Sequence, residues 1–215
     1  MKDPARSVVS DAKRIIESGY DIIGDRYRSW ADTAMEGDVR AEYFTTVETL
    51  LTDGADILEL GCGPGVEAGQ LAKRHHYVGV DLSSRQLQIA RSNVPEGRFI
   101  HRDFMTINFP AASFDAVVSF YVFNHVPGAE QDQMFRQIHS WLRPEGFLCA
   151  SLGAGKHDDM VEDEWLGVPM FFASNGMEEN ERLLGEAGFV LERSELRTEP
   201  EDDDEVTFHW VVARK

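Results

Sequence analysis

An acidic residue followed by three alternating glycines offers the clearest chemistry in this sequence. The residues are Glu59, Gly61, Gly63 and Gly65, and the stretch 55–58 before them has the composition of a strand. Glycine lets a backbone turn tightly and approach a ligand without a Cβ in the way. The pattern predicts a strand, a glycine-rich turn and a helix, which together form a nucleotide cradle.

The same stretch argues against two other kinds of nucleotide loop. A dinucleotide fingerprint would place its third glycine at position 66, which is Val66, and no Lys-Ser or Lys-Thr pair follows for a P-loop. An ionised Glu59 would repel a pyrophosphate but attract an ammonium group. The loop therefore favours a ligand that carries a cationic amino-acid tail.

A second carboxylate, Asp81, follows the glycine turn by about twenty residues, which is the spacing used for ribose recognition in related nucleotide folds. It ends the predicted strand 76–81, and a carboxylate can accept hydrogen bonds from two neighbouring hydroxyls at once. We therefore predict that Asp81 binds a ribose. Its alternative role, capping the helix that follows, can be filled by Ser83.

Four motifs in this order resemble those of the class I S-adenosylmethionine-dependent methyltransferases, specifically the small-molecule, type 11-like group. The resemblance covers residues 40–155 and rests on these stretches: Glu59–Gly65, Val78-Gly-Val-Asp81-Leu-Ser, His101-Arg-Asp103-Phe and Trp141-Leu-Arg-Pro-Glu-Gly146. It implies an α/β fold with a Rossmann-like, doubly wound, seven-stranded sheet and an antiparallel C-terminal edge strand. It also implies S-adenosyl-L-methionine as the cofactor and S-adenosyl-L-homocysteine as the product. The alternative is a dinucleotide-binding relative.

The resemblance assigns further residues to the cofactor. Asp103 would accept a hydrogen bond from the adenine amino group, and loop capping is its alternative role. The other side chains expected around the cofactor are Leu82, Gln86, Phe104, Met105 and Phe120.

Residues 1–53 are expected to form a helical cover. An amphipathic helix begins at Asp3-Pro4 and closes at Gly19, and an aromatic-rich segment follows before the first strand. In the family such a segment often covers the cofactor, with a tyrosine near its methionine end, so Tyr20 and Tyr27 are the candidates. Their alternative is packing against the core, which would leave two hydroxyl groups to be satisfied.

The end of the fourth predicted strand is where the methyl group is expected, because ligands bind outside the carboxyl ends of parallel strands. His125 lies there and could hold a proton near pH 7, so it is the candidate general base. The alternative gives His125 only a loop-holding or substrate-lining role, because many methyl transfers need little beyond alignment. Tyr121 and Asn124 are expected to border the acceptor. No Asn-Pro-Pro or Asp-Pro-Pro stretch is present, which argues against N-methyltransferases of exocyclic bases and amides.

Residues 153–176 form an apolar insert that does not fit a simple strand–helix repeat. We predict that it makes the substrate wall, and a flap over the sheet edge is the alternative. Residues 54–152 then form the cofactor-binding core and 177–215 a helix and a hairpin, within one domain; the hairpin tip, 198–205, is expected to be solvated. The predicted wall residues are Trp165, Met170, Phe171 and Phe172.

An acidic run at residues 157–164 contains the oxygen ligands that Mg²⁺ prefers. Ligands from several loops would have to converge on such an ion. Nothing in the sequence indicates that they do, so no metal is expected.

The net charge of the chain limits the classes of partner that we expect it to bind. The chain has 21 basic and 38 acidic side chains, for a net charge of −17, which would repel phosphate backbones and anionic membranes. Its N-terminus lacks the apolar core of a signal peptide, and no apolar run is long enough to span a bilayer. We expect a cytoplasmic monomer or homodimer that acts on a small molecule and binds neither nucleic acid nor membrane.

The combined prediction is transfer of a methyl group from S-adenosylmethionine to an oxygen or nitrogen of a small-molecule acceptor. The acidic surface favours a cationic or neutral acceptor such as an amine. One alternative is a protein or tRNA methyltransferase, which would need an open or basic groove. The other is a non-catalytic cofactor-binding subunit whose apolar insert meets a partner.

Overall fold

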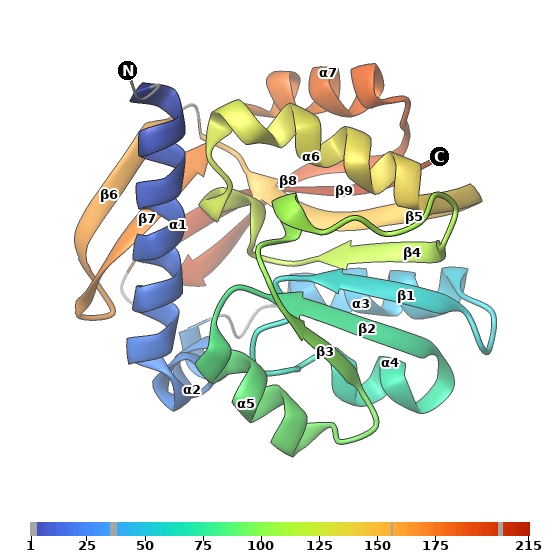
Figure 1. The fold of residues 1–215 in the computed structure, drawn as a ribbon. Coiled ribbons are helices and arrows are strands. Elements are labelled where there is room, and N and C mark those ends of the chain that lie inside the picture. Colours follow the sequence, from blue (N-terminus) through green and yellow to red (C-terminus); the bar gives the residue numbers. More distant parts are fainter. Residues whose placement is uncertain (1–3, 35–37, 156, 202–203) are drawn as a thin grey trace.

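The structure is a computed structural model that describes residues 4–34, 38–155, 157–201 and 204–215. Its centre is a seven-stranded sheet in the order β3-β2-β1-β4-β5-β9-β8, with helices on both faces (Figure 1). A separate hairpin, β6-β7, and helix α1 stand at one end of the sheet. The strands are β1 (Asp56–Leu60), β2 (His76–Asp81), β3 (Arg98–His101), β4 (Phe114–Ser119), β5 (Leu142–Gly153), β6 (His157–Trp165), β7 (Val168–Ser174), β8 (Val190–Glu201) and β9 (Asp204–Arg214).

Helices precede the first strand and then alternate with the strands. Within the described ranges, no helix is long and apolar enough to cross a bilayer. The α-helices are α1 (Pro4–Ile23), α2 (Asp25–Ala34), α3 (Asp38–Leu50), α4 (Ala68–Arg74), α5 (Ser84–Asn93), α6 (Gly128–Trp141) and α7 (Met177–Ala187), and the short 3-10 helices are η1 (Phe104–Thr106) and η2 (Phe123–His125).

The strands β1 to β5 pair in parallel, whereas β9 runs antiparallel to both β5 and β8. This pairing confirms the predicted doubly wound sheet with an antiparallel C-terminal edge. The antiparallel strand, β9, lies one position in from the edge, which β8 forms. Because the parallel strands share one direction, their carboxyl ends meet at the end of the sheet that α1 crosses (Figure 1).

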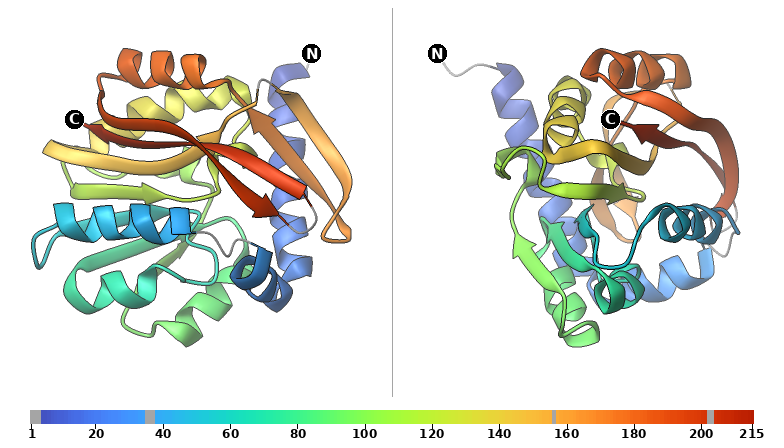
Figure 2. Two further views of the ribbon diagram at one scale, coloured as in Figure 1. Left: turned by 180° about the vertical axis from the view of Figure 1, so that it is seen from behind. Right: turned by 90° about the vertical axis from the view of Figure 1, so that its right-hand side faces the viewer.

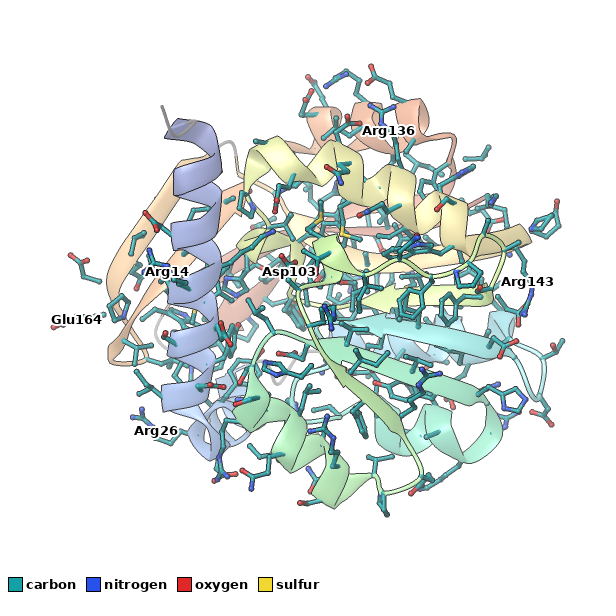
Figure 3. The ribbon with its side chains drawn as sticks, viewed as in Figure 1. Arg14, Arg26, Asp103, Arg136, Arg143 and Glu164 are labelled. Carbon is teal, nitrogen blue, oxygen red and sulfur yellow. The ribbon has the colours of Figure 1, made fainter. Side chains whose placement is uncertain are left out.

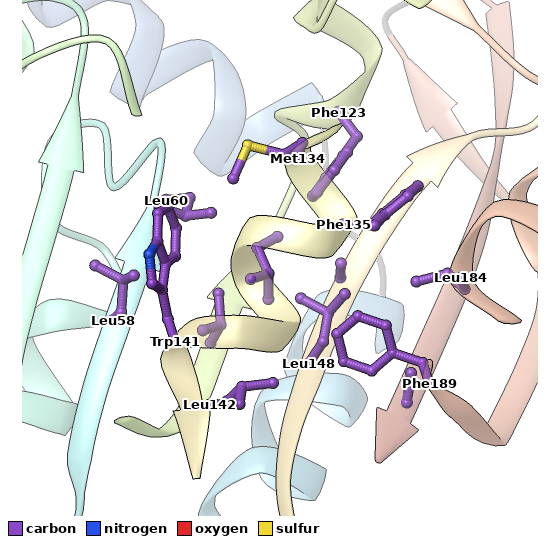
Figure 4. Close-up of a cluster of buried hydrophobic side chains, with 14 of the residues drawn as sticks. Leu58, Leu60, Phe123, Met134, Phe135, Trp141, Leu142, Leu148, Leu184 and Phe189 are labelled. Atoms are coloured by element: carbon purple, nitrogen blue, oxygen red, sulfur yellow. The ribbon is translucent and has the colours of Figure 1, made fainter. Parts of the chain in front are cut away.

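Two hydrophobic layers hold the helices against the sheet. On one face α6 and α7 pack through a cluster that includes Phe135, Trp141 and Leu148 (Figure 4). On the other face α3 and α4 pack through a cluster that includes Tyr43 and Trp210. Figure 2 shows the sheet between these layers from behind and from the side. Covered on both faces, β1 and β4 are almost entirely buried, as expected of central parallel strands.

The predicted insert is a β-hairpin. Its strands β6 and β7 pair antiparallel to each other and form a sheet of their own beside α1 (Figures 1 and 2). The buried side of α1, including Ala12, Ile16 and Ile23, packs against Val168 and Met170 of β7. The hairpin therefore supports α1 where it crosses the ends of the parallel strands.

Helix α1 continues through Gly19, where the sequence predicted its end, and stops at Ile23. A Cβ on Gly19 would lie 2.7 Å from the Met170 Cε atom and 3.2 Å from the Pro169 carbonyl oxygen. Gly19 therefore serves close approach of the helix to β7, and it does not end the helix. The chain leaves the helix at Gly24, whose φ is +53°. The predicted cap Asp3 lies outside the described residues.

The C-terminal hairpin is longer than predicted. β8 and β9 pair as far as Glu201 and Asp204, so most of the stretch 198–205 is strand, and Thr198, Pro200 and Glu205 within it are exposed as expected. Glu199 is buried there and accepts a hydrogen bond from the Tyr121 hydroxyl at 3.0 Å. This end of the hairpin thus reaches the carboxyl end of β4.

We expect Gly19→Val to destabilise the fold by about 1–3 kcal/mol, because the new side chain would collide with Met170 and Pro169. Ser18→Val is the matched control, since Ser18 is exposed on the same helix and its replacement carries the same β-branched penalty. Urea unfolding measures both free energies. Equal values for the two variants would show that α1 does not depend on close contact with β7.

Candidate active site

The glycine turn closes the carboxyl end of β1. The amides of Gly61 and Cys62 both donate to the Val80 carbonyl, at 2.8 and 3.1 Å, and tie the turn to β2. The φ angles of Gly61, Gly63 and Gly65 are +65°, +49° and +80°. Glycine adopts this left-handed conformation without strain, so the turn needs glycine at all three positions.

The three glycines have different surroundings. Gly61 and Gly63 line a cavity at this end of the sheet, named the main cavity because most of the predicted cofactor residues surround it, and a Cβ on Gly61 would overlap the side chain of Val122. Gly65, also predicted to touch the cofactor, lies against α5 instead, where an added Cβ would be 3.3 Å from the Ala90 Cβ. Gly65 therefore packs the turn onto α5.

Asp81 ends β2 beside the turn and lines the main cavity. Its carboxylate accepts hydrogen bonds from the amides of Gly63 and Ser83, both at 2.8 Å. Burial raises the pKa of Asp81, and these backbone donors oppose the shift. The cap of α5 comes from the Ser83 hydroxyl, which accepts from the Gln86 amide at 3.1 Å. A carboxylate has lone pairs for about four donors, so Asp81 can accept two further hydroxyl groups.

Asp103 precedes η1 and lies beside α1 (Figure 3). Its Oδ1 accepts from the Met105 amide at 2.9 Å, which is the capping role, and its Oδ2 accepts from Lys13 Nζ at 2.7 Å. Lys13 also donates to Glu130 at 3.0 Å. Burial acts to lower the pKa of Lys13, but the hydrogen bonds to both carboxylates raise it by more. Lys13 therefore fastens α1 over the main cavity.

Sequence reasoning missed Lys13, although a signal was present. Lys13, Ile16 and Tyr20 follow one another at helical spacing, so they share one face of α1, and all three line the main cavity. The other predicted cofactor residues that line it are Tyr27, Leu82, Gln86, Phe104, Met105 and Phe120.

Gln86 connects the cover to α5. Its Nε2 donates to the Gly24 carbonyl at 3.0 Å, and its buried Oε1 has no hydrogen-bond partner among the described residues. Asp21 of α1 makes a second connection, because its Oδ1 accepts from the Ser83 hydroxyl at 2.6 Å and from the Arg85 amide at 3.0 Å. The C-terminal end of α1 is thereby fixed to the start of α5.

Glu59 lies behind the glycine turn, in a smaller cavity that adjoins the main one and shares Gly61 and Gly63 with it. Its side chain is 3% exposed and accepts a hydrogen bond from the Tyr77 hydroxyl. Burial raises the pKa of Glu59 well above its usual range. The sequence analysis assumed that Glu59 is ionised, but its burial favours the neutral form. A cation bound next to Glu59 would favour the ionised form.

Arg40 of α3 lines the same small cavity and was missed in the sequence. Its guanidinium donates to both oxygens of Glu67, at 2.6 and 2.8 Å, and lies 5.6 Å from the centroid of the Tyr121 ring. Arg40 and Glu59 are complementary to the carboxylate and the ammonium group of an amino acid.

His125 joins three elements. Its Nδ1 donates to the Phe171 carbonyl of β7 at 2.7 Å, which leaves Nε2 to accept the hydroxyl proton of Tyr20 at 2.8 Å. Burial lowers the pKa of His125 to about 4, so the imidazole is neutral at pH 7. Burial also raises the pKa of Tyr20. The Tyr20 hydroxyl therefore occupies the acceptor nitrogen of His125.

A second cavity of about 430 Å³ adjoins the main one and shares Tyr20, Tyr27, Tyr121 and His125 with it. Tyr121 has a φ of +58°, a strained conformation for a residue with a side chain. The Ser151 hydroxyl holds it by accepting from its amide at 2.6 Å. The strained residue thus stands between the two cavities, at the end of β4.

Four of the residues predicted for the acceptor line the second cavity: Tyr121, Asn124, Trp165 and Phe172. Met170 and Phe171 were predicted for the same wall but are buried in the cluster between β7 and α1. The apolar insert therefore divides its side chains between the cavity and the support of α1. Lining residues that the sequence did not suggest include Trp30, Glu162, Glu201, Glu205 and Phe208.

Metal ligands do not gather in the described part of the chain, where no group of three or more His, Cys, Asp or Glu side chains could hold an ion. Of the acidic run, the side chains of His157 and Asp158 lie outside the described ones.

Fold and site together define a class of protein. A doubly wound sheet with this strand order carries a glycine turn after β1, a carboxylate after β2 and another after β3, all at one cavity. This is the arrangement of a nucleoside-binding site at the carboxyl ends of parallel strands. The smaller cavity beside it matches an amino acid, so the ligand that fits both is a nucleoside joined to an amino acid.

Comparison with known proteins agrees with this class. Residues 57–146 match the profile of a family described as a methyltransferase domain. Over these residues the chain is similar to methyltransferases that use S-adenosylmethionine, and S-adenosylmethionine is the cofactor of that class.

Relatives and solved structures extend the comparison. An uncharacterised methyltransferase of Oceanobacillus iheyensis is 35% identical over 95 residues, which are 43% of this chain and 44% of that protein. A sterol 24-C-methyltransferase of Debaryomyces hansenii is 24% identical over 226 residues, or 91% of this chain and 59% of that protein. The chain thus spans about half the length of these curated relatives. The crystal structure of a Burkholderia thailandensis 1,6-didemethyltoxoflavin-N1-methyltransferase with bound S-adenosylhomocysteine is similar in fold, with a TM-score of 0.67, 20% identity and coverage of 100% of this chain and 91% of that one.

Gly61→Ala is expected to weaken S-adenosylhomocysteine binding more than tenfold, because the new Cβ overlaps Val122 at the cavity wall. Gly54→Ala is the matched control, since Gly54 also has a positive φ, +80°, but no atom within 4 Å of an added Cβ. Both variants carry a left-handed alanine, which costs about 1–2 kcal/mol. Calorimetric titration of both variants measures the affinities. Similar affinities would show that the contact with Val122 does not shape the site.

The folded state should lose stability as the pH falls from about 6.5 towards 4, because the unfolded chain protonates His125 in that range and the folded chain does not. The loss attributable to His125 amounts to about 3 kcal/mol. Urea unfolding at several pH values measures it as the difference in slope between the wild type and His125→Gln. An unchanged slope in His125→Gln would contradict a buried neutral imidazole.

Proposed function

We propose that this protein transfers the methyl group of S-adenosylmethionine to a nitrogen or oxygen atom of a small-molecule acceptor. The observation that carries the proposal is the junction of the two cavities at Tyr20, Tyr27, Tyr121 and His125. One cavity has the complement of a nucleoside and an amino acid, and the other is lined by aromatic rings and carboxylates. A methyl group at their junction would lie between its donor and its acceptor.

The residues of the first cavity would bind the cofactor by its polar groups. Asp81 would accept the two ribose hydroxyls, and Asp103 Oδ2 would accept from the adenine amino group alongside Lys13. Glu59 and Arg40 would face the ammonium and carboxylate of the amino-acid tail. When bound, the cofactor supplies an electrophilic methyl on a sulfonium.

The residues at the junction would align the acceptor. Methyl transfer is an in-line displacement, so correct placement of the nucleophile supplies much of the rate. Tyr20, fixed by its hydrogen bond to His125, and Tyr121, fixed by Ser151, are rigid walls for that purpose. His125 can act as a base only through Tyr20, and its pKa of about 4 makes it a weak one, so positioning Tyr20 is its main role.

Methylation of carbon is the second candidate reaction. One relative is a sterol 24-C-methyltransferase, and an aromatic cavity stabilises positive charge that develops on a substrate. A carbon acceptor would be recognised by a new carbon–carbon bond in the product.

Calorimetric titration with S-adenosylmethionine and S-adenosylhomocysteine tests the proposal. We expect micromolar affinity, about −8 kcal/mol, and a loss of more than tenfold in Asp81→Asn, which removes the charge that faces the ribose. Asp53→Asn, on an exposed turn, is the control and should bind as the wild type does. The absence of binding to the wild-type protein would overturn the proposal. An acceptor that is methylated only when it is part of a protein or a tRNA would replace the small-molecule assignment.

A further inference from the structure

We propose that the acceptor is an amine that binds as a cation and is methylated on its nitrogen. This inference rests on the proposed function and adds the chemical class of the acceptor. The second cavity, with its aromatic wall and its set of hydrogen-bond acceptors, carries it.

Four rings form one wall of this cavity: Tyr20, Tyr27, Trp30 and Trp165. The centroids of neighbouring rings lie 5.2 to 6.4 Å apart, and the rings meet edge to face or tilted. All four rings line the cavity, so a ligand in it would contact them. The face of an aromatic ring attracts a cation, and cages of such rings bind alkylated ammonium groups.

The polar side chains that line the second cavity favour a ligand that donates hydrogen bonds. The buried Oδ1 of Asn124 has no hydrogen-bond partner in the described part of the chain, so it would accept an N–H from the acceptor. The carboxylates of Glu162, Glu201 and Glu205 also line the cavity.

The charged side chains described in the lining of the second cavity are all acidic. Among the described residues that line this cavity there is no Lys or Arg, and His125 is neutral. A ligand with a carboxylate or a phosphate would be repelled by the three glutamates, and a cation would be attracted.

The weak base at the junction fits the same class. A hydroxyl acceptor must give up its proton as it attacks, and the buried His125 is poorly suited to take it. An ammonium group loses its proton before attack, to a lining carboxylate and then to water. The nitrogen lone pair then forms the N–C bond while the C–S bond breaks with its electron pair going to sulfur, which yields a methylated ammonium and S-adenosylhomocysteine.

The charge preference can be measured with two probes of one shape. Protein loaded with S-adenosylhomocysteine is titrated with choline and with its uncharged isostere 3,3-dimethylbutan-1-ol. We expect choline to bind about tenfold more tightly, as cation–π contacts and the glutamates require.

Two variants assign the preference to the cavity. Trp165→Leu and Glu162→Gln should each reduce it, whereas Glu164→Gln should not, because Glu164 is exposed on the same strand and points away from the molecule (Figure 3). All three should bind S-adenosylhomocysteine as the wild type does, since none of these residues lines the cofactor cavity.

The outcomes separate the two proposals. If the protein binds S-adenosylhomocysteine but prefers the uncharged probe, shows no preference or binds neither probe, the amine assignment is overturned and methyl transfer stands. A preference that Glu164→Gln reduces as much as Glu162→Gln also overturns the assignment. If the protein does not bind S-adenosylhomocysteine, the proposed function itself fails.

The methylated atom is tested with N,N-dimethylethanolamine, which offers a nitrogen and a hydroxyl in one molecule. Incubation with S-adenosylmethionine should give choline, recognised by mass spectrometry through its permanent charge. Formation of the methyl ether, or of neither product in a protein that binds cofactor and choline, would overturn methylation on nitrogen.

Discussion

The hydrogen-bonded chain from Tyr20 through His125 to the Phe171 carbonyl is the contact on which the site depends. It joins α1, η2 and β7, and its two links span 105 and 46 residues of sequence. A neutral imidazole has one donor and one acceptor nitrogen, and this chain uses both. Burial keeps the imidazole neutral and therefore keeps the chain intact. The wall between the two cavities exists because these three segments are held together.

Much of the cofactor side could be predicted from the sequence, because its residues lie next to strand ends. Asp81 ends β2 and Asp103 lies two residues after β3, and parallel strands bring such positions to one edge of the sheet. The resemblance carried by the same motifs also predicted a doubly wound, seven-stranded sheet, which the pairing confirms. The capping role of Ser83 could also be predicted from the sequence, because its hydrogen bond joins two residues that are three positions apart.

The other features of the fold and of the site depend on contacts between segments that are distant in the sequence, and local sequence patterns do not reveal such contacts. Gly19 looked like a helix end, and only the approach of β7 explains its lack of a side chain. Lys13 and Arg40 gain their roles from carboxylates on other elements. Spacing likewise could not show that Met170 packs under α1, or that Glu59 would be buried deeply enough for its pKa to rise.

Helix α1 is a wall of both cavities. Lys13, Ile16 and Tyr20 of this helix line the main cavity, where Lys13 forms ion pairs with Asp103 and Glu130. Tyr20 also lines the second cavity, together with residues of the two hairpins such as Glu162 and Glu205. A ligand that shifted the helix in one cavity would therefore change the shape of the other.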